Sequence, residues 1–104
     1  MWIFLNNSFL SLVEDLDNPD YLMVRARIEG DIESVFPGAE VTYTPDFDYY
    51  YRTSIPKKEV AKYIAKMIES ISYSNFKNSV KDRSRHEAYF DVWDVMRMEG
   101  DRRV

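Results

Sequence analysis

The apolar residues of this chain change their spacing once, near Pro56, and this change constrains the fold more than any other feature. Before it, short runs rich in β-branched and aromatic residues alternate apolar with polar side chains, as strands with one wet face do. After it, apolar residues recur at helical spacing. Because strands come early and helices late, we predict an α+β fold, an antiparallel sheet of about five strands with helices packed on one face.

The predicted elements follow the order β-β-β-α-β-β-α-α. Asn6-Asn7-Ser8 separates the first two strands, and Asn tolerates the positive φ of tight hairpin turns. Gly30-Asp31 ends the third strand and caps a short helix, which Pro37-Gly38 then ends. Two further strands form a second hairpin around residues 45–48. The expected strands and short helix cover residues 2–5, 9–14, 21–28, 32–36, 41–44 and 49–55.

Two longer helices are expected near residues 56–71 and 84–99. Pro56 suits the first position of a helix, where its missing N–H is not needed. The Ser84-x-x-Glu87 spacing is that of a capping box, and Gly100 suits a helix end. A short helical turn through Phe76 and Val80 is expected between these two helices. The residues that we predict in the core from these helices are Ile64, Ile68, Tyr89 and Trp93.

Length and composition favour one domain spanning residues 1–104. A chain of 104 residues that is 45% hydrophobic can build a single packed core. It contains no cysteine, which excludes disulfides, thiolate zinc sites and cysteine nucleophiles. The apolar run 1–5 is too short for a signal peptide or a membrane span. We therefore expect a cytoplasmic protein of a bacterium or an infected cell, without a membrane partner.

Charge is divided unevenly along the chain. Residues 1–55 carry ten acidic residues against three arginines, a net −7, whereas residues 56–104 carry eleven basic and eight acidic residues, a net +3. The split suggests an acidic face and a mildly basic face, each able to steer a different partner. The alternative is ordinary solvated surface.

No catalytic, metal-binding or cofactor-binding set stands out. His86 is the only histidine, and a small hydrolase or nuclease using it with Asp82 or Glu87 is an alternative that no accompanying motif supports. Residues 14–20 hold four carboxylates on a turn, but the calcium-loop template fails because Asp20 stands at its glycine position and Ala26 at its final glutamate position. We predict no catalytic residue, no metal and no cofactor.

The most distinctive stretch is an acidic, tyrosine-rich hairpin over residues 43–51. Core packing can use only about half of its rings, because alternate strand residues face opposite sides. Tyrosine is favoured at interface centres, and flanking acids complement a basic partner. The predicted partner-binding residues are Tyr43, Asp46, Phe47, Asp48, Tyr49, Tyr50 and Tyr51.

A second stretch, the basic segment 73–86, interleaves cations with rings. Proteins that bind single-stranded nucleic acid use this combination of basic residues and rings. The chain as a whole, however, is acidic. A solvated loop between helices is the structural alternative. The residues of this alternative nucleic-acid site are Tyr73, Phe76, Lys77, Lys81, Arg83, Arg85 and His86.

Three stretches of the chain resemble a group of small proteins of bacteria and their mobile elements. The resemblance is carried by Val35-Phe36-Pro37-Gly38-Ala39 and Val92-Trp93 together with residues 1–10, 13–15, 24–27, 30–33, 75–77 and 85–89. It implies a self-contained domain and no assigned activity. In kind, a short, acidic, cysteine-free chain is also similar to phage-encoded anti-CRISPR proteins.

The sequence thus favours a non-enzymatic binding protein, with a counter-defence inhibitor as its specific form. The expected partner is a host protein or nucleoprotein with a basic surface, and direct nucleic-acid binding is the alternative. The sequence specifies no oligomeric state.

Overall fold

The computed structural model describes residues 1–104, which divide into two compact units, Met1–Ser72 and Tyr73–Val104. The expectation of one domain over the whole chain stays a prediction.

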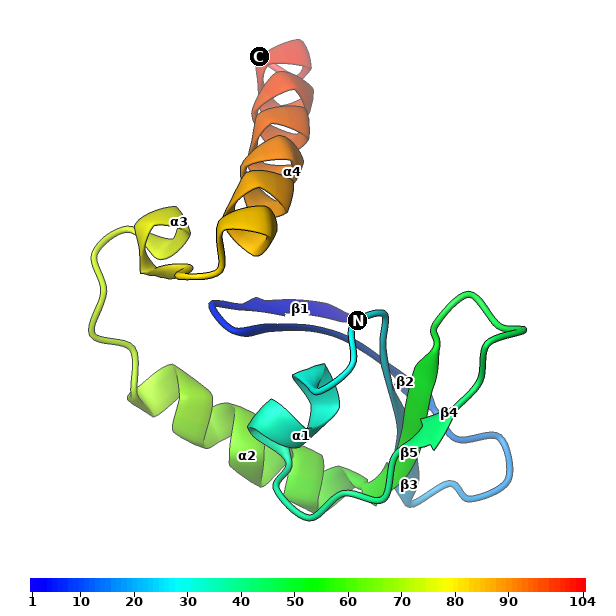
Figure 1. The fold of residues 1–104 in the computed structure, drawn as a ribbon. Coiled ribbons are helices and arrows are strands. Elements are labelled where there is room, and N and C mark those ends of the chain that lie inside the picture. Colours follow the sequence, from blue (N-terminus) through cyan, green and yellow to red (C-terminus); the bar gives the residue numbers. More distant parts are fainter. The chain divides into compact units, whose positions relative to one another are not determined.

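The first unit holds a five-stranded antiparallel sheet, which confirms the predicted fold class (Figure 1). The strand order is β1-β2-β3-β5-β4, so the last strand, β5, lies between β3 and β4. The edge strand β4 is short, because only Thr42 and Tyr43 pair with β5. Its strands are β1 (Trp2–Leu5), β2 (Ser8–Glu14), β3 (Tyr21–Ala26), β4 (Thr42–Tyr43) and β5 (Tyr51–Pro56).

The two helices of this unit, α1 (Asp31–Val35) and α2 (Lys57–Glu69), lie on the same side of the sheet (Figure 1). Their buried side chains join one cluster with those of the central strands, so a single apolar core holds sheet and helices together. The fully or almost fully buried members of this core are Leu10, Leu12, Val24, Ala26, Ile32, Val35, Phe36, Ile55 and Val60.

The turns lie where the sequence predicted them, but the first one differs in its backbone conformation. Asn6 and Asn7 close the first hairpin without a positive φ, because only Gly30 and Gly38 adopt one. Gly38 has φ of +86° in the turn where the Ala39 amide donates to the Phe36 carbonyl. Proline followed by a positive-φ glycine is the signature of a type II turn. This turn directs the chain from α1 toward β4.

Asp31 is the first residue of α1 and not its cap, and its side chain bonds to the sheet. Gly30, without a side chain, stands at the N-cap of α1, and the buried Asp31 carboxylate accepts the Phe9 amide at 3.0 Å. The Phe9 amide lies where β2 extends beyond the end of β3. The carboxylate therefore continues the hydrogen bonding that the missing strand residue would supply.

The second unit consists of α3 (Phe76–Ser79) and α4 (Arg83–Arg102), which confirms a short helical turn before a long helix. The predicted capping box is wrong, because Asp82 is the N-cap and its carboxylate accepts the Arg85 amide at 2.9 Å. Aspartate is as good a cap as serine and begins the helix earlier. The helix also continues through Gly100 to Arg102.

Two of the four predicted core residues are not buried. Ile68 is 63% exposed and Trp93 is 45% exposed, whereas Tyr89 is buried and Ile64 packs against the core of the first unit. The apolar stripe of α2 meets the sheet only through its first three turns, so Ile68 at the far end has no strand to cover it. Helical spacing gives the face of a side chain but not the length of the surface opposite.

Candidate interaction surface

The hairpin 43–51 divides its rings between the two faces of the sheet. Tyr51 follows the core side and packs against the apolar cluster, whereas Tyr49, Tyr50 and Phe47 belong to the connection that returns from β4 to β5. The Tyr50 carbonyl accepts the Thr44 amide at 2.6 Å, which extends the hairpin ladder beyond β4. The connection is therefore continuous with the sheet at its base.

Three arginines hold this connection by stacking on its rings. Arg25 lies over Tyr49 at 4.4 Å from the ring centroid, Arg27 over Tyr50 at 4.5 Å, and Arg52 over Phe47 at 4.6 Å. Cation–π contacts of this kind contribute about 0.5–1 kcal/mol each at exposed sites and more when desolvated. We call Arg25, Arg27 and Arg52 the arginine clamp.

Hydrogen bonds add to the arginine clamp. The Arg27 guanidinium donates to the Asp48 carbonyl, and Arg52 donates to the Asp48 carboxylate at 3.1 Å. The Asp48 carboxylate also accepts the Tyr49 amide at 2.9 Å. Asp48 is thus a structural residue of the connection as well as an exposed acid.

The arginine clamp contains a local electrostatic conflict. Arg25 and Arg52 stand directly opposite each other on β3 and β5, where like charges are destabilising. Only Arg52 has a carboxylate partner; Arg25 bonds to the Ser11 hydroxyl at 2.7 Å, and its buried Nε has no hydrogen bond. A half-buried arginine without a counter-ion is costly, so the Tyr49 ring is its main compensating contact.

Three rings and two acids of the hairpin face solvent. Tyr43 is 61% exposed, Phe47 58% and Tyr50 37%, whereas Tyr49 is only 9% exposed. Asp46 and Asp48 are also exposed, and Asp46 has no partner within the chain. Burial raises the pKa of Tyr51, and the charges of Glu29, Tyr43 and Glu33 add to this effect. The accessible set is therefore Tyr43, Asp46, Phe47, Asp48 and Tyr50.

The basic segment 73–86 uses its rings within the second unit. Phe76 stacks on Tyr89 with centroids 5.7 Å apart, and Tyr73 lies 5.7 Å from Phe76. Lys77 sits over the Trp93 ring at 4.6 Å. Tyr73 and Phe76 are therefore only partly exposed and offer less surface for stacking on bases, whereas Trp93 is 45% exposed.

The remaining cations of this segment differ in their partners. Arg83 forms an ion pair with Glu87 at 3.5 Å, and Arg85 donates to the Tyr89 hydroxyl at 3.4 Å. Lys81 is exposed without an ion pair.

His86 is tied to the backbone. Its Nδ1 lies 2.7 Å from the Lys77 carbonyl oxygen, so Nδ1 carries the proton and donates it. Asp82 caps α4 and Glu87 pairs with Arg83, so neither carboxylate orients the imidazole. The geometry thus offers no observation in favour of the hydrolase alternative.

The arginine clamp was missed by the sequence reasoning. Alternation in β3 does place Arg25 on the wet face, and the same rule places Arg52 there in β5, which was the available signal. Their meeting with Tyr49 and Phe47 depends on the β3–β5 register, which the sequence does not specify.

None of the four helices combines the length and the apolar character required to cross a membrane. No protein-family model, curated protein or solved structure matches this chain. The resemblance to small proteins of bacteria and mobile elements therefore stays a prediction.

Proposed function

We propose that this chain is a non-enzymatic binding protein that docks the hairpin 43–51 on a basic protein surface. The supporting observation is the arginine clamp, which holds the hairpin while Tyr43, Phe47 and Tyr50 remain exposed beside Asp46 and Asp48. A recognition loop that is ordered before binding loses less conformational entropy on association. Exposed rings supply the contact area and the acids steer a cationic partner.

In the specific form of this proposal, the partner is a nucleic-acid-binding protein of a bacterial or infected cytoplasm. Phe47 stands between two carboxylates, an arrangement that resembles a base between phosphates. Such a ligand would compete with nucleic acid for the same basic surface. A counter-defence inhibitor of the anti-CRISPR kind would work in this way.

Charge reversal at Asp46 tests the proposal most directly, because that side chain has no partner to lose within the chain. We expect Asp46→Lys to weaken binding to a partner isolated with the parent protein by about 1–3 kcal/mol and to slow association. Asp17→Lys is the matched control, since it makes the same charge change on an exposed turn of the same unit. Surface plasmon resonance at two salt concentrations measures both rates.

Equal weakening by the two variants would leave only a non-specific charge effect, and no weakening by either would overturn the proposal. A second measurement addresses nucleic acid: the parent protein should displace a labelled oligonucleotide from the partner. Simultaneous binding of both ligands would contradict the competitive form. Loss of oligonucleotide binding by the chain itself in Lys81→Glu would favour the basic segment 73–86 instead.

A further inference from the structure

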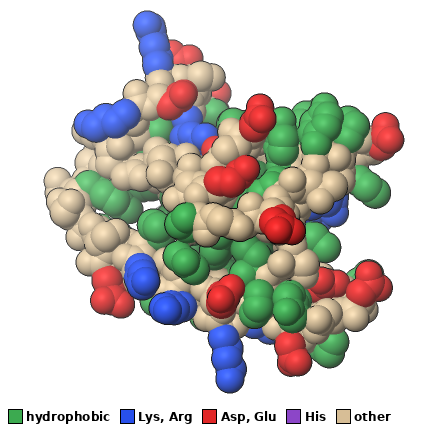
Figure 2. Space-filling model, turned by 60° about the horizontal axis from the view of Figure 1, so that its bottom comes forward, with side chains coloured by type: hydrophobic (Ala, Val, Ile, Leu, Met, Phe, Trp, Pro, Cys, Tyr) green, Lys and Arg blue, Asp and Glu red, His purple; other side chains and the backbone are tan.

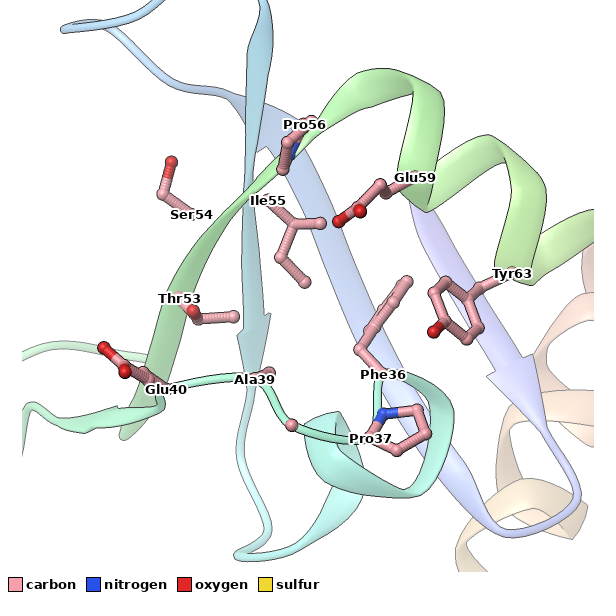
Figure 3. A pocket seen from close by; sticks show the side chains of 11 residues that line it. Phe36, Pro37, Ala39, Glu40, Thr53, Ser54, Ile55, Pro56, Glu59 and Tyr63 are labelled. Atoms are coloured by element: carbon pink, nitrogen blue, oxygen red, sulfur yellow. The ribbon is translucent and has the colours of Figure 1, made fainter.

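A solvent-open groove of about 520 Å³ lies beside β5 in the first unit. Its floor and walls come from the turn after α1, the second half of β5 and the first turns of α2 (Figure 3). The Phe36 and Tyr63 rings form its apolar end, in edge-to-face contact at 5.5 Å. A smaller hollow of about 290 Å³ shares Glu40, Thr53 and Ser54 with it and extends to Met23 and Arg52.

The groove follows an unfilled edge of the sheet. The Tyr50 carbonyl accepts from Thr44 on the β4 side, so by alternation the backbone groups of Arg52 and Ser54 also face that side, away from β3. Arg52 pairs there with Thr42, but no β4 residue pairs with Ser54 because β4 begins only at Thr42. The Ser54 N–H and C=O therefore have no backbone partner.

The two hollows lie on opposite faces of β5 at this point. Ile55 and Phe36 belong to the core side, whereas Met23 and Arg52 belong to the other side, as the β3–β5 register shows. An added strand sends alternate side chains to opposite faces of a sheet. The space beside Ser54 thus offers backbone groups to an added strand, and a hollow on each face of the sheet for its alternate side chains.

The charge of the groove favours a cation. Glu40 and Glu59 line it, both are exposed, and neither forms an ion pair within the chain. In Figure 3 the Glu59 carboxylate points from α2 toward Ile55, and the Tyr63 ring lies beside the Phe36 ring. Figure 2 shows hydrophobic side chains at the surface between acidic ones. No lysine lines the groove.

From this edge and its charges we infer that β5 binds an extended peptide carrying a lysine or arginine. The peptide continues the position of β4 and exchanges hydrogen bonds with the Ser54 backbone. Its basic side chain enters the larger groove, where Glu59 and Glu40 supply negative charge and the two rings supply apolar surface. This site does not depend on the hairpin 43–51.

A blocked peptide of sequence Val-Thr-Lys-Thr-Val tests the inference by NMR titration of the full chain. We expect saturable shifts of the Ser54 amide and weaker binding by the same peptide with glutamate in place of lysine. The key variants are Ser54→Pro, which removes the N–H, and Ser54→Ala, which keeps it. Both variants lose the hydrogen bond from the Ser54 hydroxyl to Asp15, so the comparison between them isolates the backbone N–H of residue 54.

Ser54→Pro should bind the lysine peptide about tenfold more weakly than Ser54→Ala, as expected for one lost ladder hydrogen bond. N-methylation of the peptide backbone should have a similar effect, and this arm leaves the protein unaltered. Glu59→Gln should weaken the lysine peptide and not an uncharged one. Asp46→Lys should bind the peptide as the parent does, which separates this site from the hairpin.

The inference is overturned if the lysine peptide causes no shift at Ser54 in the parent chain. It is also overturned if the N-methylated peptide binds as tightly as the unmodified one, because contact through side chains alone would then explain the binding. Equal affinity of the lysine and glutamate peptides would contradict the assignment of a basic ligand.

Discussion

The hairpin 43–51 and the basic segment 73–86 contain the same kinds of residue, rings mixed with charges, and use them in opposite ways. In the hairpin, three arginines from outside it or at its end stack on the rings, and three rings still face solvent. In the basic segment, the two rings, Tyr73 and Phe76, pack on each other and on Tyr89, and both are only partly exposed. Composition therefore indicates which contacts are available, whereas the neighbouring elements decide whether rings remain accessible to a partner.

The largest difference between the two regions should appear when a ring is removed. Tyr49→Ala should lower the unfolding free energy of the first unit by about 2–4 kcal/mol, because it deletes a buried ring and leaves Arg25 half-buried without compensation. Phe76→Ala should cost about 1–2 kcal/mol and act only within the second unit. Urea denaturation with amide exchange measures both.

A loss of unfolding free energy in Tyr49→Ala no larger than in Phe76→Ala would contradict this difference between the two regions. Unchanged amide exchange over residues 42–52 in Tyr49→Ala would also contradict it, since the arginine clamp would then not hold the hairpin.

A smaller difference is expected when a cation is removed. Arg27 and Lys77 sit at nearly equal distances over their rings, 4.5 and 4.6 Å. Lys77→Gln should cost about 0.5–1 kcal/mol, the value of an exposed cation–π contact. Arg27→Gln should cost slightly more, because Arg27 also donates to the Asp48 carbonyl.

Amide exchange distinguishes these two variants. Arg27→Gln should accelerate exchange at residues 48–50, whereas Lys77→Gln should shift the indole signal of Trp93 and leave residues 48–50 unaffected. Faster exchange in the hairpin upon Lys77→Gln would contradict the separation of the two regions.

The smallest effect concerns pH at the base of β5. The Ser54 hydroxyl bonds to the Asp15 carboxylate and, with the Asp17 amide, holds the pKa of Asp15 below its usual 3.8. Because the folded pKa is the lower one, the ionised carboxylate stabilises the fold above about pH 3.8, and this stabilisation is lost as pH falls through the folded pKa.

Ser54→Ala should raise the pKa of Asp15 toward 3.8, measured by NMR titration of its carboxyl carbon. Ser70→Ala is the control, because the Ser70 hydroxyl donates to the Met67 carbonyl and not to a carboxylate. If the pKa of Asp15 stays low in Ser54→Ala, the backbone amide donors, not the Ser54 hydroxyl, lower it.

The sequence by itself determined the fold class and the order of the elements. Alternation before Pro56, helical spacing after it and the Pro37-Gly38 turn are local signals, and local backbone preferences decide strands, helices and turns. The same signals placed the hairpin 43–51 and predicted that its rings could not all be core.

Only the tertiary structure decided which rings and charges meet. The β3–β5 register brings Arg25 opposite Arg52, and the short β4 leaves the Ser54 backbone open beside the groove. The structure also showed that Trp93 and Ile68 are exposed, although their spacing placed them on apolar faces. Spacing along one element cannot give these results, because register, strand length and burial depend on what lies across from each residue.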